Sequence, residues 1–379
     1  MNFIINASLY NVIGVDSTKD ISFDKRVTIL TGYNGCGKTT ILRCIHETVS
    51  LYNNGVFANP RKGWAIEVNF NGKFKIRNYS LPSDRKEIKL EEHNYFSERV
   101  KVDAKLKDGY QIIFNKLSPE SVDNKNKKDQ IKLTKDFGRS ARNNGLIQLV
   151  NKDKNEDPYL TILFCDELFY FNGEGVDNEK IRLEELDVYS RANNLSKTLY
   201  MLLQSFSKHS ILSENDKNAN KTLIELKRLL PLVPVKIRDQ LEVNIKALED
   251  DYGRKDIKDF MIIVNQFFNL TKREALIDGE GLICLSFGDD IVKWYDLSKG
   301  EKTLLSLLLV VYLNKDKKVT FLFDEPDLSL HIKWQRILIE RLASIAPSCQ
   351  FIISTHSPAL IGNFSDQKIV NISAMFREQ

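Results

Sequence analysis

The sequence predicts an α/β fold with a mixed sheet, an antiparallel β region and an inserted helical lobe. Three observations predict this fold class. A glycine-rich turn separates the β-rich segment 20–31 from a helical pattern that starts at Thr39. An apolar run at 319–323 ends in two acidic residues, as a buried parallel strand does at the edge of a sheet. A helical stretch at 179–275 separates two groups of strand-like segments.

Length and composition narrow the class of protein. The chain has 379 residues, enough for two or three structural units. Apolar residues make up 42% and charged residues 28%, values typical of soluble globular proteins. The 55 Lys and Arg against 51 Asp and Glu give a net charge of +4, too small to attract a nucleic acid through the field of the whole molecule. Any contact with DNA must therefore be local.

Cysteine usage and apolar runs bear on the compartment. The cysteines form no CxxC pair and have no histidine at metal-ligand spacing, so neither a zinc site nor a disulfide framework is predicted. They are Cys36, Cys44, Cys165, Cys284 and Cys349. The start of the chain has no basic leader, and the most apolar run, 304–313, is about half as long as a membrane span. The sequence predicts a cytoplasmic protein with no membrane partner.

The first half of the chain is predicted to contain mainly strands. Segments 3–15 and 20–31 predict two or three strands, and the apolar spacing from Thr39 predicts a helix. Alternation of apolar and polar residues at 64–115 predicts an antiparallel region. From 123 to 154, nine Lys and Arg stand against four Asp, which fits either a solvated surface loop or contacts with a nucleic-acid backbone.

The second half returns from helix to strand. No heptad register persists within 179–275, so a compact helical lobe is expected rather than a coiled-coil arm. Beyond it, the pattern predicts strands at 281–287, 291–297, 319–325 and 350–355 and helices at 302–313 and 332–345. The expected division is an N-terminal part at 1–165, a helical insertion lobe at 166–280 and a C-terminal part at 281–379.

The strongest motif is Gly32-Tyr33-Asn34-Gly35-Cys36-Gly37-Lys38-Thr39, which fits G-x-x-x-x-G-K-[ST] between a strand and a helix. In such a loop the backbone N–H groups converge on phosphate oxygens at a helix N-terminus. Lys38 can reach the β and γ phosphates, and the Thr39 hydroxyl can ligate Mg²⁺. The motif predicts a site for a nucleoside triphosphate. Cys36 is either a redox handle or, as we prefer, a tolerated small residue.

Two acidic residues follow the apolar run at 319–323. Asp324 is expected to hold Mg²⁺ through water, and Glu325 is expected to polarise the attacking water. A second apolar stretch ends in Asp166 and Glu167, so this pattern alone does not decide between the two pairs. The motifs on either side favour the later pair.

Those motifs are the turn 297–301 and the segment 354–357. Ser298 and Gly300 open an apolar helix, so a hydroxyl, backbone N–H groups and a helix N-terminus form a second candidate anion site. Read alone, this turn is equally an ordinary helix N-cap. His356, at a predicted strand end, is expected to contact the γ phosphate.

With these four motifs in this order, the chain resembles an ABC-type P-loop ATPase head, and within that group the SMC, RecF and OLD-like branch. The resemblance covers about residues 1–60 and 281–365. It implies that 32–40 is the Walker A loop, 297–301 the signature, Asp324 and Glu325 the Walker B pair, and His356 the switch histidine.

The resemblance also implies the cofactors and the site residues. ATP and Mg²⁺ are the expected cofactors, with Thr39 and Asp324 on the metal and Glu325, Lys38 and His356 in hydrolysis. The expected nucleotide contacts are Gly32, Asn34, Gly35, Cys36, Gly37, Lys38, Thr39, Thr40, Ser298, Gly300 and Glu301. Lys299, Glu301 and His331 depart from the transporter pattern and look like the OLD-like branch. The usual Q-loop glutamine is not identified, although Gln148 is a candidate.

The resemblance implies a head-to-head homodimer with ATP held between the Walker A loop of one copy and the signature of the other. Such a dimer closes with ATP and opens on hydrolysis. Stand-alone heads of this kind resemble ATPase subunits of bacterial anti-phage systems of the Septu and PARIS types. The leading hypothesis is therefore an ATPase switch that controls a separate effector, a nuclease or other toxin acting in trans.

Three other functions are weighed against this hypothesis. A DNA-maintenance ATPase of the SMC or RecF type would clamp duplex DNA, with the basic stretch 123–154 on the phosphates. A transporter subunit would need a membrane partner, and both the signature and His331 argue against it. A small-molecule kinase has no reason to carry a signature turn.

Overall fold

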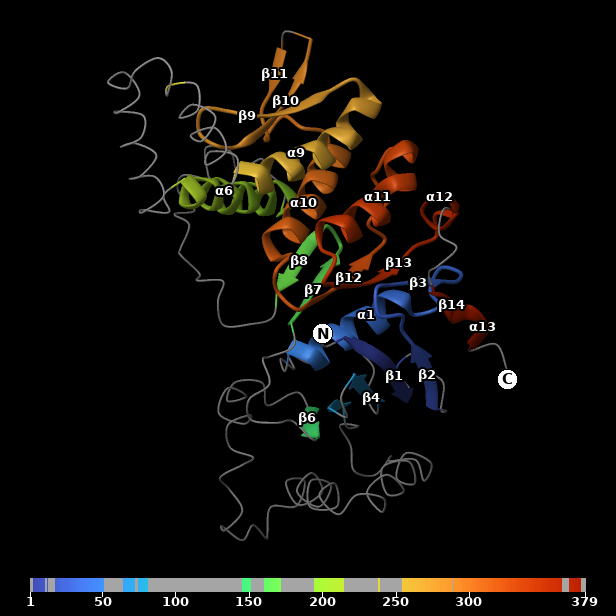
Figure 1. Cartoon of the computed structure of the whole chain (residues 1–379). Helices are drawn as coiled ribbons and strands as arrows, with labels where there is room; N and C mark the ends of the chain where they lie inside the picture. Colours follow the sequence, from blue (N-terminus) through green and yellow to red (C-terminus); the bar gives the residue numbers. More distant parts are fainter. Residues whose placement is uncertain are drawn as a thin grey trace.

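Three β-sheets and the helices packed on them make up the described part of the chain (Figure 1). The structure is a computed structural model that describes residues 3–10, 12, 18–50, 64–71, 74–80, 145–150, 160–171, 194–214, 238, 254–288, 290–362 and 368–375. The expected α/β fold class with a mixed sheet is confirmed. No helix within these ranges is both long and apolar enough to cross a membrane.

The central sheet has the strand order β14-β3-β13-β12-β7-β8. Its strands are β3 (Val27–Thr31), β7 (Leu160–Cys165), β8 (Leu168–Phe171), β12 (Val319–Asp324), β13 (Gln350–Ser354) and β14 (Lys368–Asn371). All neighbours pair in parallel except β7 and β8, which form an antiparallel hairpin. The carboxyl ends of β3, β12, β13 and β7 therefore meet at one edge, where the residues that follow them are brought together.

A second sheet is antiparallel and has the order β2-β1-β4-β5-β6. Its strands are β1 (Ile4–Tyr10), β2 (Thr18–Ser22), β4 (Trp64–Phe70), β5 (Lys75–Ser80) and β6 (Gly145–Val150). The predicted antiparallel region is confirmed up to residue 80, and 81–115 lie outside the described residues. Most of the basic stretch 123–154 also lies outside them. The candidate Gln148 falls on β6, opposite Arg77.

A third sheet, β11-β10-β9, lies beside the helices. Its strands are β9 (Glu274–Ile277), β10 (Ile283–Phe287) and β11 (Asp290–Val292). The helices are α1 (Lys38–Ser50), α6 (Asn194–Glu214), α9 (Arg254–Phe268), the 3₁₀ turn η3 (Asn269–Thr271), α10 (Lys299–Asn314), α11 (Ile332–Ile345), α12 (Pro358–Ile361) and α13 (Ile372–Met375). The predicted helix at 332–345 has its expected bounds, and the helix expected at 302–313 begins three residues earlier.

Each face of the central sheet packs on a different hydrophobic core. On β12, Leu322 belongs to the core that contains α1 and the antiparallel sheet, whereas Phe321 and Phe323 belong to the core beneath α6, α9, α10 and α11. This alternation follows from the two-residue period of a strand. The helix α1, which starts in the glycine-rich turn, is thus held between two sheets.

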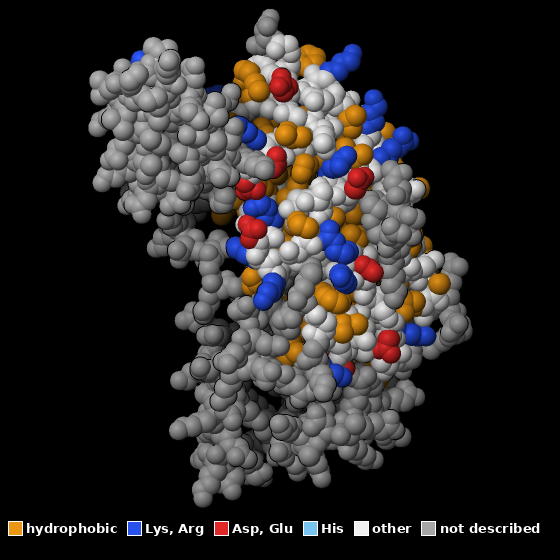
Figure 2. Space-filling model, in the orientation of Figure 1, with side chains coloured by type: hydrophobic (Ala, Val, Ile, Leu, Met, Phe, Trp, Pro, Cys, Tyr) orange, Lys and Arg blue, Asp and Glu red, His pale blue; other side chains and the backbone are white. Residues whose placement is uncertain are grey.

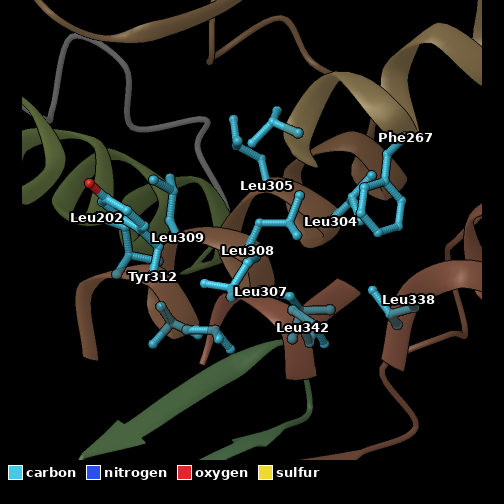
Figure 3. Close-up of a cluster of buried hydrophobic side chains, with 14 of the residues drawn as sticks. Leu202, Phe267, Leu304, Leu305, Leu307, Leu308, Leu309, Tyr312, Leu338 and Leu342 are labelled. Atoms are coloured by element: carbon cyan, nitrogen blue, oxygen red, sulfur yellow. The ribbon is translucent and has the colours of Figure 1, made fainter. Parts of the chain in front are cut away.

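The second core explains why α10 is apolar on every side. Its residues from Thr303 to Tyr312 are all buried, and Figure 3 shows its leucines between Leu202 of α6, Phe267 of α9 and Leu338 and Leu342 of α11. A helix surrounded by other elements has no polar face. Its N-terminus, at the turn 297–301, is therefore fixed by packing along the rest of the helix.

The expected three-part division stays a prediction. Two antiparallel hairpins run across its boundaries: β7 pairs with β8 across 165 and 166, and β9 pairs with β10 across 280 and 281. Between them, the structure describes the helices α6 and α9, the 3₁₀ turn η3 and the single residue 238.

Candidate functional site

The loop 32–40 leaves β3 and enters α1 at Lys38. Three of its residues have positive φ angles: Gly32 at 144°, Gly35 at 80° and Gly37 at 95°. Residues with a side chain rarely adopt these angles, so glycine lets the chain curl at three points within a few residues. The first N–H groups of α1 have no helical partner and carry the positive end of its dipole. The loop therefore has the form of an anion cradle.

A serine near the end of the chain supports this loop. The hydroxyl of Ser373, on α13, accepts a hydrogen bond of 2.7 Å from the N–H of Tyr33. A Cβ at Gly32 would lie 2.4 Å from the same Oγ atom, so only glycine fits there. Ser373 was not predicted from the sequence, and no local signal points to it because the contact spans most of the chain.

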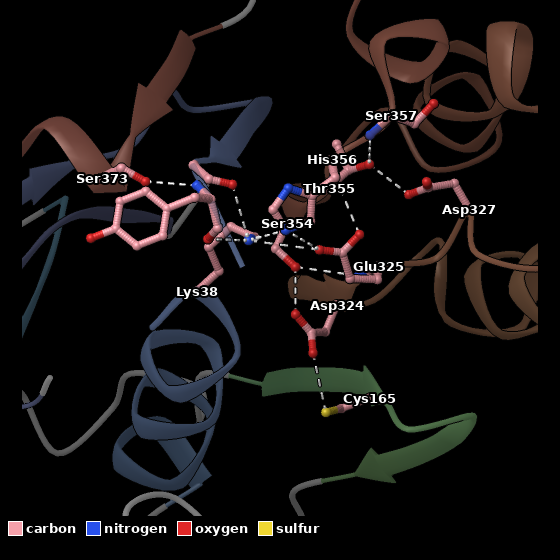
Figure 4. Close-up of polar contacts among 12 residues, drawn as sticks. Lys38, Cys165, Asp324, Glu325, Asp327, Ser354, Thr355, His356, Ser357 and Ser373 are labelled. Carbon is pink, nitrogen blue, oxygen red and sulfur yellow. Dashed lines mark hydrogen bonds and ion pairs between the residues drawn. The ribbon is translucent and has the colours of Figure 1, made fainter. Parts of the chain in front are cut away.

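Lys38 lies buried over the loop, with its side chain 5% exposed. Its Nζ atom lies 3.4 Å from the carbonyl oxygen of Gly32, 2.5 Å from Nε2 of His356 and 3.8 Å from Oε1 of Glu325 (Figure 4). An ammonium group can only donate, so Nε2 of His356 accepts and the proton of a neutral imidazole is on Nδ1. Three residues predicted to act on the γ phosphate are thus brought together.

Asp324 ends β12 at the shared edge of the sheet and is buried. Its Oδ1 atom accepts a hydrogen bond of 2.5 Å from the Ser354 hydroxyl, and its Oδ2 atom lies 3.4 Å from the sulfur of Cys165 (Figure 4). Neighbouring strands therefore orient this carboxylate from both sides. Burial raises the pKa of the Cys165 thiol to about 12, so the sulfur contacts Asp324 as a neutral donor.

Glu325 follows β12 with a φ angle of 46°. Its N–H donates to the carbonyl oxygen of Ser354 at 3.0 Å, and its Oε2 atom accepts from the His356 N–H at 3.3 Å. Burial raises the pKa of this carboxyl group, while His356 and Lys38 oppose the rise and Asp327 adds to it. A raised pKa makes the carboxylate a better proton acceptor than an ordinary glutamate.

A second layer of polar residues holds the two segments that carry Glu325 and His356. The buried Asp327 accepts a hydrogen bond of 2.6 Å from the Thr355 hydroxyl. Gln335, on α11, donates to the carbonyl oxygens of Asp327 and Leu330 at 3.1 and 3.0 Å. Its Oε1 atom accepts from the Ser357 hydroxyl at 2.6 Å. Neither Asp327 nor Gln335 was predicted from the sequence, although Asp327 lies only three residues beyond Asp324.

The turn at Ser298 forms a capping box on α10. The Ser298 hydroxyl accepts from the N–H of Glu301 at 3.4 Å, and the Glu301 carboxylate accepts from the N–H of Ser298 at 2.8 Å. The carboxylate also pairs with Arg273 at 3.0 Å. Glu301 is therefore engaged inside its own chain, where it orients the turn, and its expected contact with nucleotide stays a prediction.

Gly300 has a packing reason to be glycine. A Cβ at this position would lie 2.4 Å from the carbonyl oxygen of Ser329, in the loop that follows β12. The Ser329 hydroxyl also lies 3.2 Å from that of Thr303 on α10. The start of α10 and the loop after Glu325 are thus in direct contact.

The remaining predicted residues lie in the same loop. Asn34 is exposed, Thr39 and Thr40 are partly buried at the start of α1, and Cys36 is buried. A buried cysteine in a tight loop agrees with the preferred interpretation of a tolerated small residue. The competing pair Asp166 and Glu167 forms the two-residue turn of the β7–β8 hairpin.

The donor set fits ATP with Mg²⁺. The positive-φ glycines, the start of α1 and the buried Lys38 suit a triphosphate. The Thr39 hydroxyl and the Asp324 carboxylate are hard oxygen ligands, which Mg²⁺ prefers.

Comparison with known proteins agrees with this chemistry. The model of the AAA_15 family, described as "AAA ATPase domain", matches residues 15–361. The "Retron Vc95 probable ATPase" of Vibrio cholerae serotype O1 biovar El Tor is 23% identical over 410 residues, covering 98% of this chain and 73% of that protein. The "Septu protein PtuA" of Bacillus mycoides (strain KBAB4) is 26% identical over 133 residues, covering 30% of this chain and 19% of that protein. The expected resemblance to Septu-type ATPases is confirmed, and the PARIS resemblance stays a prediction.

A solved structure shares a more distant likeness. The Smc head domain derived from Pyrococcus furiosus, solved with an extended coiled coil and bound to the C-terminal domain of ScpA, matches with a TM-score of 0.47 and 15% identity. The match covers 98% of this chain and 94% of that one. A likeness of this degree gives no information about function.

Proposed function

The chain belongs to the AAA_15 family of AAA ATPase domains and is an ATPase, and we propose that it works as a nucleotide-controlled switch made from two copies of itself. The observation that carries this proposal is the convergence of Lys38, Glu325 and His356 above the glycine-rich loop. Bound ATP with Mg²⁺ would supply the charge and the scissile bond. The output is then a change in assembly rather than a small-molecule product.

The residues of the chain have distinct roles in this proposal. Lys38 and the start of α1 hold the phosphates, and Thr39 and Asp324 hold the metal ion. Glu325 accepts a proton from the attacking water, which its raised pKa favours. His356 orients that carboxylate through its backbone N–H, which donates to Oε2 of Glu325 at 3.3 Å, and its side chain contacts the γ phosphate. Hydrolysis therefore depends on groups at the ends of β12 and β13.

The Ser298 turn is the reason to propose two copies. Within the described residues, the hydrogen bonds and ion pairs of Lys38, Glu325 and His356 involve neither Ser298 nor Glu301. The turn nevertheless has the features of an anion site: a serine hydroxyl at the N-terminus of a long buried helix. A second copy can bring this turn to the γ phosphate, which then bridges the two chains.

We further propose that the switch controls a separate effector, a nuclease or other toxin, in bacterial anti-phage defence. Its similarity to a retron ATPase over almost the whole chain, and to Septu PtuA over a shorter part, supports this role. The alternative of a DNA clamp relied on the basic stretch 123–154, most of which lies outside the described residues. On the face shown in Figure 2, Lys and Arg are interspersed with acidic and hydrophobic side chains. The DNA clamp stays a prediction of the sequence.

The composite site is tested by ATP-dependent dimerisation. We expect Glu325→Gln to retain ATP and to accumulate dimers or larger assemblies, measured by light scattering with ATP and Mg²⁺. In that background, Ser298→Asp keeps a good helix cap but places a negative charge against the phosphate, so dimers should be lost. Ser298→Asn is the matched control, because it caps the helix without a charge and should allow dimers. A Glu325→Gln chain that stays monomeric with bound ATP contradicts the proposal.

Nucleotide binding itself is tested separately. Lys38→Ala should lose ATP binding, measured by titration with a fluorescent ATP analogue, because the buried ammonium group is removed from the loop. Unchanged affinity in this variant would mean that the loop 32–40 is not the triphosphate site.

A further inference from the structure

The two-residue turn between β7 and β8 carries adjacent carboxylates at the edge of the sheet that holds the candidate site. Asp166 and Glu167 have φ angles of 51° and 64°, so both adopt the left-handed conformation. Two such residues in succession are typical of the tight turns that join hairpin strands. Because β7 runs parallel to β12 and pairs with it, this turn lies at the same end of the sheet as Asp324.

The first carboxylate of the turn is tied to the nucleotide site. Asp166 forms an ion pair with Arg43 of α1, one helical turn after Thr39. The same Nη2 atom of Arg43 lies 3.1 Å from the sulfur of Cys165. That sulfur lies 3.4 Å from the carboxylate of Asp324 (Figure 4). A continuous set of polar contacts therefore runs from the proposed metal-binding aspartate to the turn.

The second carboxylate of the turn is tied to α10. Glu167 forms an ion pair with Lys299, the first residue of α10 and the neighbour of Ser298. The two side chains are 40% and 56% exposed. Exposed ion pairs contribute little to the stability of a fold. This pair nevertheless links the hairpin turn directly to the start of α10.

We propose that the Asp166–Glu167 turn couples the nucleotide on the loop 32–40 to the position of Ser298 in the same chain. Nucleotide and metal at Thr39 and Asp324 act on Arg43 and Cys165, and the hairpin turn passes any displacement to Lys299. Asp166, Glu167 and Lys299 are positioning residues in this account. On the proposed function, Ser298 serves the nucleotide of a partner copy, so the turn would connect the two sites of a dimer.

Amide hydrogen exchange of the full chain tests this coupling. In the Glu325→Gln background, adding ATP and Mg²⁺ should slow exchange of the peptide that covers the start of α10, and Lys38→Ala should abolish the slowing. Glu167→Lys and Lys299→Glu should each abolish it while ATP binding persists. The double variant restores an ion pair with reversed charges and should restore the slowing. Asp166→Asn, which tolerates the left-handed conformation without a charge, should also lose it.

A surface charge elsewhere provides the control. Glu340 on α11 is exposed and pairs with its neighbour Arg341 at 3.5 Å, so Glu340→Lys should leave the slowing unchanged. Should a charge reversal fail to fold by circular dichroism, Glu167→Gln removes the same charge without reversing it. The coupling is wrong if the slowing persists in Glu167→Lys or if the parent chain shows no slowing. It is also wrong if the double variant does not restore the slowing.

Light scattering on the same samples separates this inference from the proposed function on which it builds. If the parent chain with ATP stays monomeric but the slowing depends on Glu167 and Lys299, the coupling stands and the dimer is wrong. If dimers form and the slowing does not depend on Glu167 or Lys299, the dimer stands and the coupling is wrong.

Discussion

Glu325 occupies a backbone conformation that costs a residue with a side chain about 1–2 kcal/mol. The cost is offset by contacts with the end of β13, where the carbonyl oxygen of Ser354 accepts its N–H and the N–H of His356 donates to its carboxylate. The positive φ angle turns the side chain away from the strand direction and toward Lys38. The strain is thus located at the one carboxylate proposed to accept a proton.

The charge of Asp327 provides a prediction about that proton acceptor. Asp327 is among the groups that raise the pKa of Glu325. Asp327→Asn removes the charge and keeps an oxygen that can accept from Thr355. Because a general base acts only when deprotonated, kcat/KM rises with pH through its pKa. We expect the variant to lower the pKa of Glu325 and to move the acid limb of ATP hydrolysis to lower pH, measured as kcat/KM against pH.

The control for this experiment is a carboxylate remote from the site. Asp316, which is 87% exposed and pairs with Lys315, can be changed to Asn without altering the charges around Glu325. An acid limb that moves upward, or that shifts equally in Asp316→Asn, would contradict the assignment of Glu325 as the base.

At this scale the sequence predicts what is local and misses what is remote. Lys38, Asp324, Glu325 and His356 can be predicted as site residues because each stands at a fixed offset from a recognisable strand or turn. Ser373, which fills the space beside Gly32, is separated from it by almost the whole chain. Gln335 lies in the first turn of an amphipathic helix, where nothing in the pattern indicates that its amide holds two loops.

Among the elements, α10 is buried along most of its length and begins at the Ser298 turn, which the proposed function places on the nucleotide of a partner copy. The buried side chains of α10 leave the helix little freedom to slide, and the capping box fixes the direction of its first turn. The carbonyl oxygen of Ser329, in the loop after β12, packs closely against Gly300 in this turn. A movement of the loop that carries Glu325 should therefore displace Ser298.

Gly300 gives a prediction about this contact. In Gly300→Ala the new Cβ would meet the carbonyl oxygen of Ser329, a backbone atom that cannot rotate away. We expect a loss of about 1–3 kcal/mol in the free energy of unfolding, measured by urea denaturation, together with a fall in ATP hydrolysis. Gly279→Ala is the matched control, because a Cβ there meets nothing within 4 Å and should change stability by less than about 0.5 kcal/mol. Equal stability of the two variants would mean that the contact is not tight.

Element prediction succeeds where burial sets a clear period and fails where tertiary pairing decides. The helix α11 has the predicted bounds because its apolar residues recur at helical spacing up to Ile345. The short strands β8 and β9 were not predicted, because the segment 166–280 was assigned to a helical lobe. Both strands exist as hairpin partners, β8 of β7 and β9 of β10, so their conformation depends on the hairpins they form.

At the scale of the whole molecule, the proposed function divides each nucleotide site between two chains. The loop 32–40 and Glu325 would form one half-site, and the Ser298 turn at the start of α10 would form the other. In a symmetric dimer with a two-fold axis, each half would meet its complement on the partner. Two nucleotides would then be enclosed at equivalent positions, and neither binding site would be complete without both chains.

This arrangement predicts that two inactive variants rescue each other. Lys38→Ala removes the phosphate-binding half-site, and Ser298→Asp repels phosphate from the other half-site while keeping the helix cap. Neither variant should dimerise with itself, because Lys38→Ala binds no ATP and Ser298→Asp repels it, so the dimers in an equal mixture are mixed and each has one intact composite site. Hydrolysis should therefore recover to at most about half of the wild-type rate if the two sites act independently. The measurement is phosphate release from each variant alone and from the mixture at equal total concentration.

The composition of the mixture supplies the control. Mixing Lys38→Ala with Glu325→Gln restores no site, since both changes affect the same half-site. In a mixed dimer one site lacks its lysine and the other lacks its base. Recovery in this second mixture would mean that the chains do not work as paired half-sites. Recovery confined to the first mixture requires Ser298 of one chain to act on the nucleotide held by Lys38 of another. Neither variant has both an intact Lys38 and an intact Ser298 in the same chain.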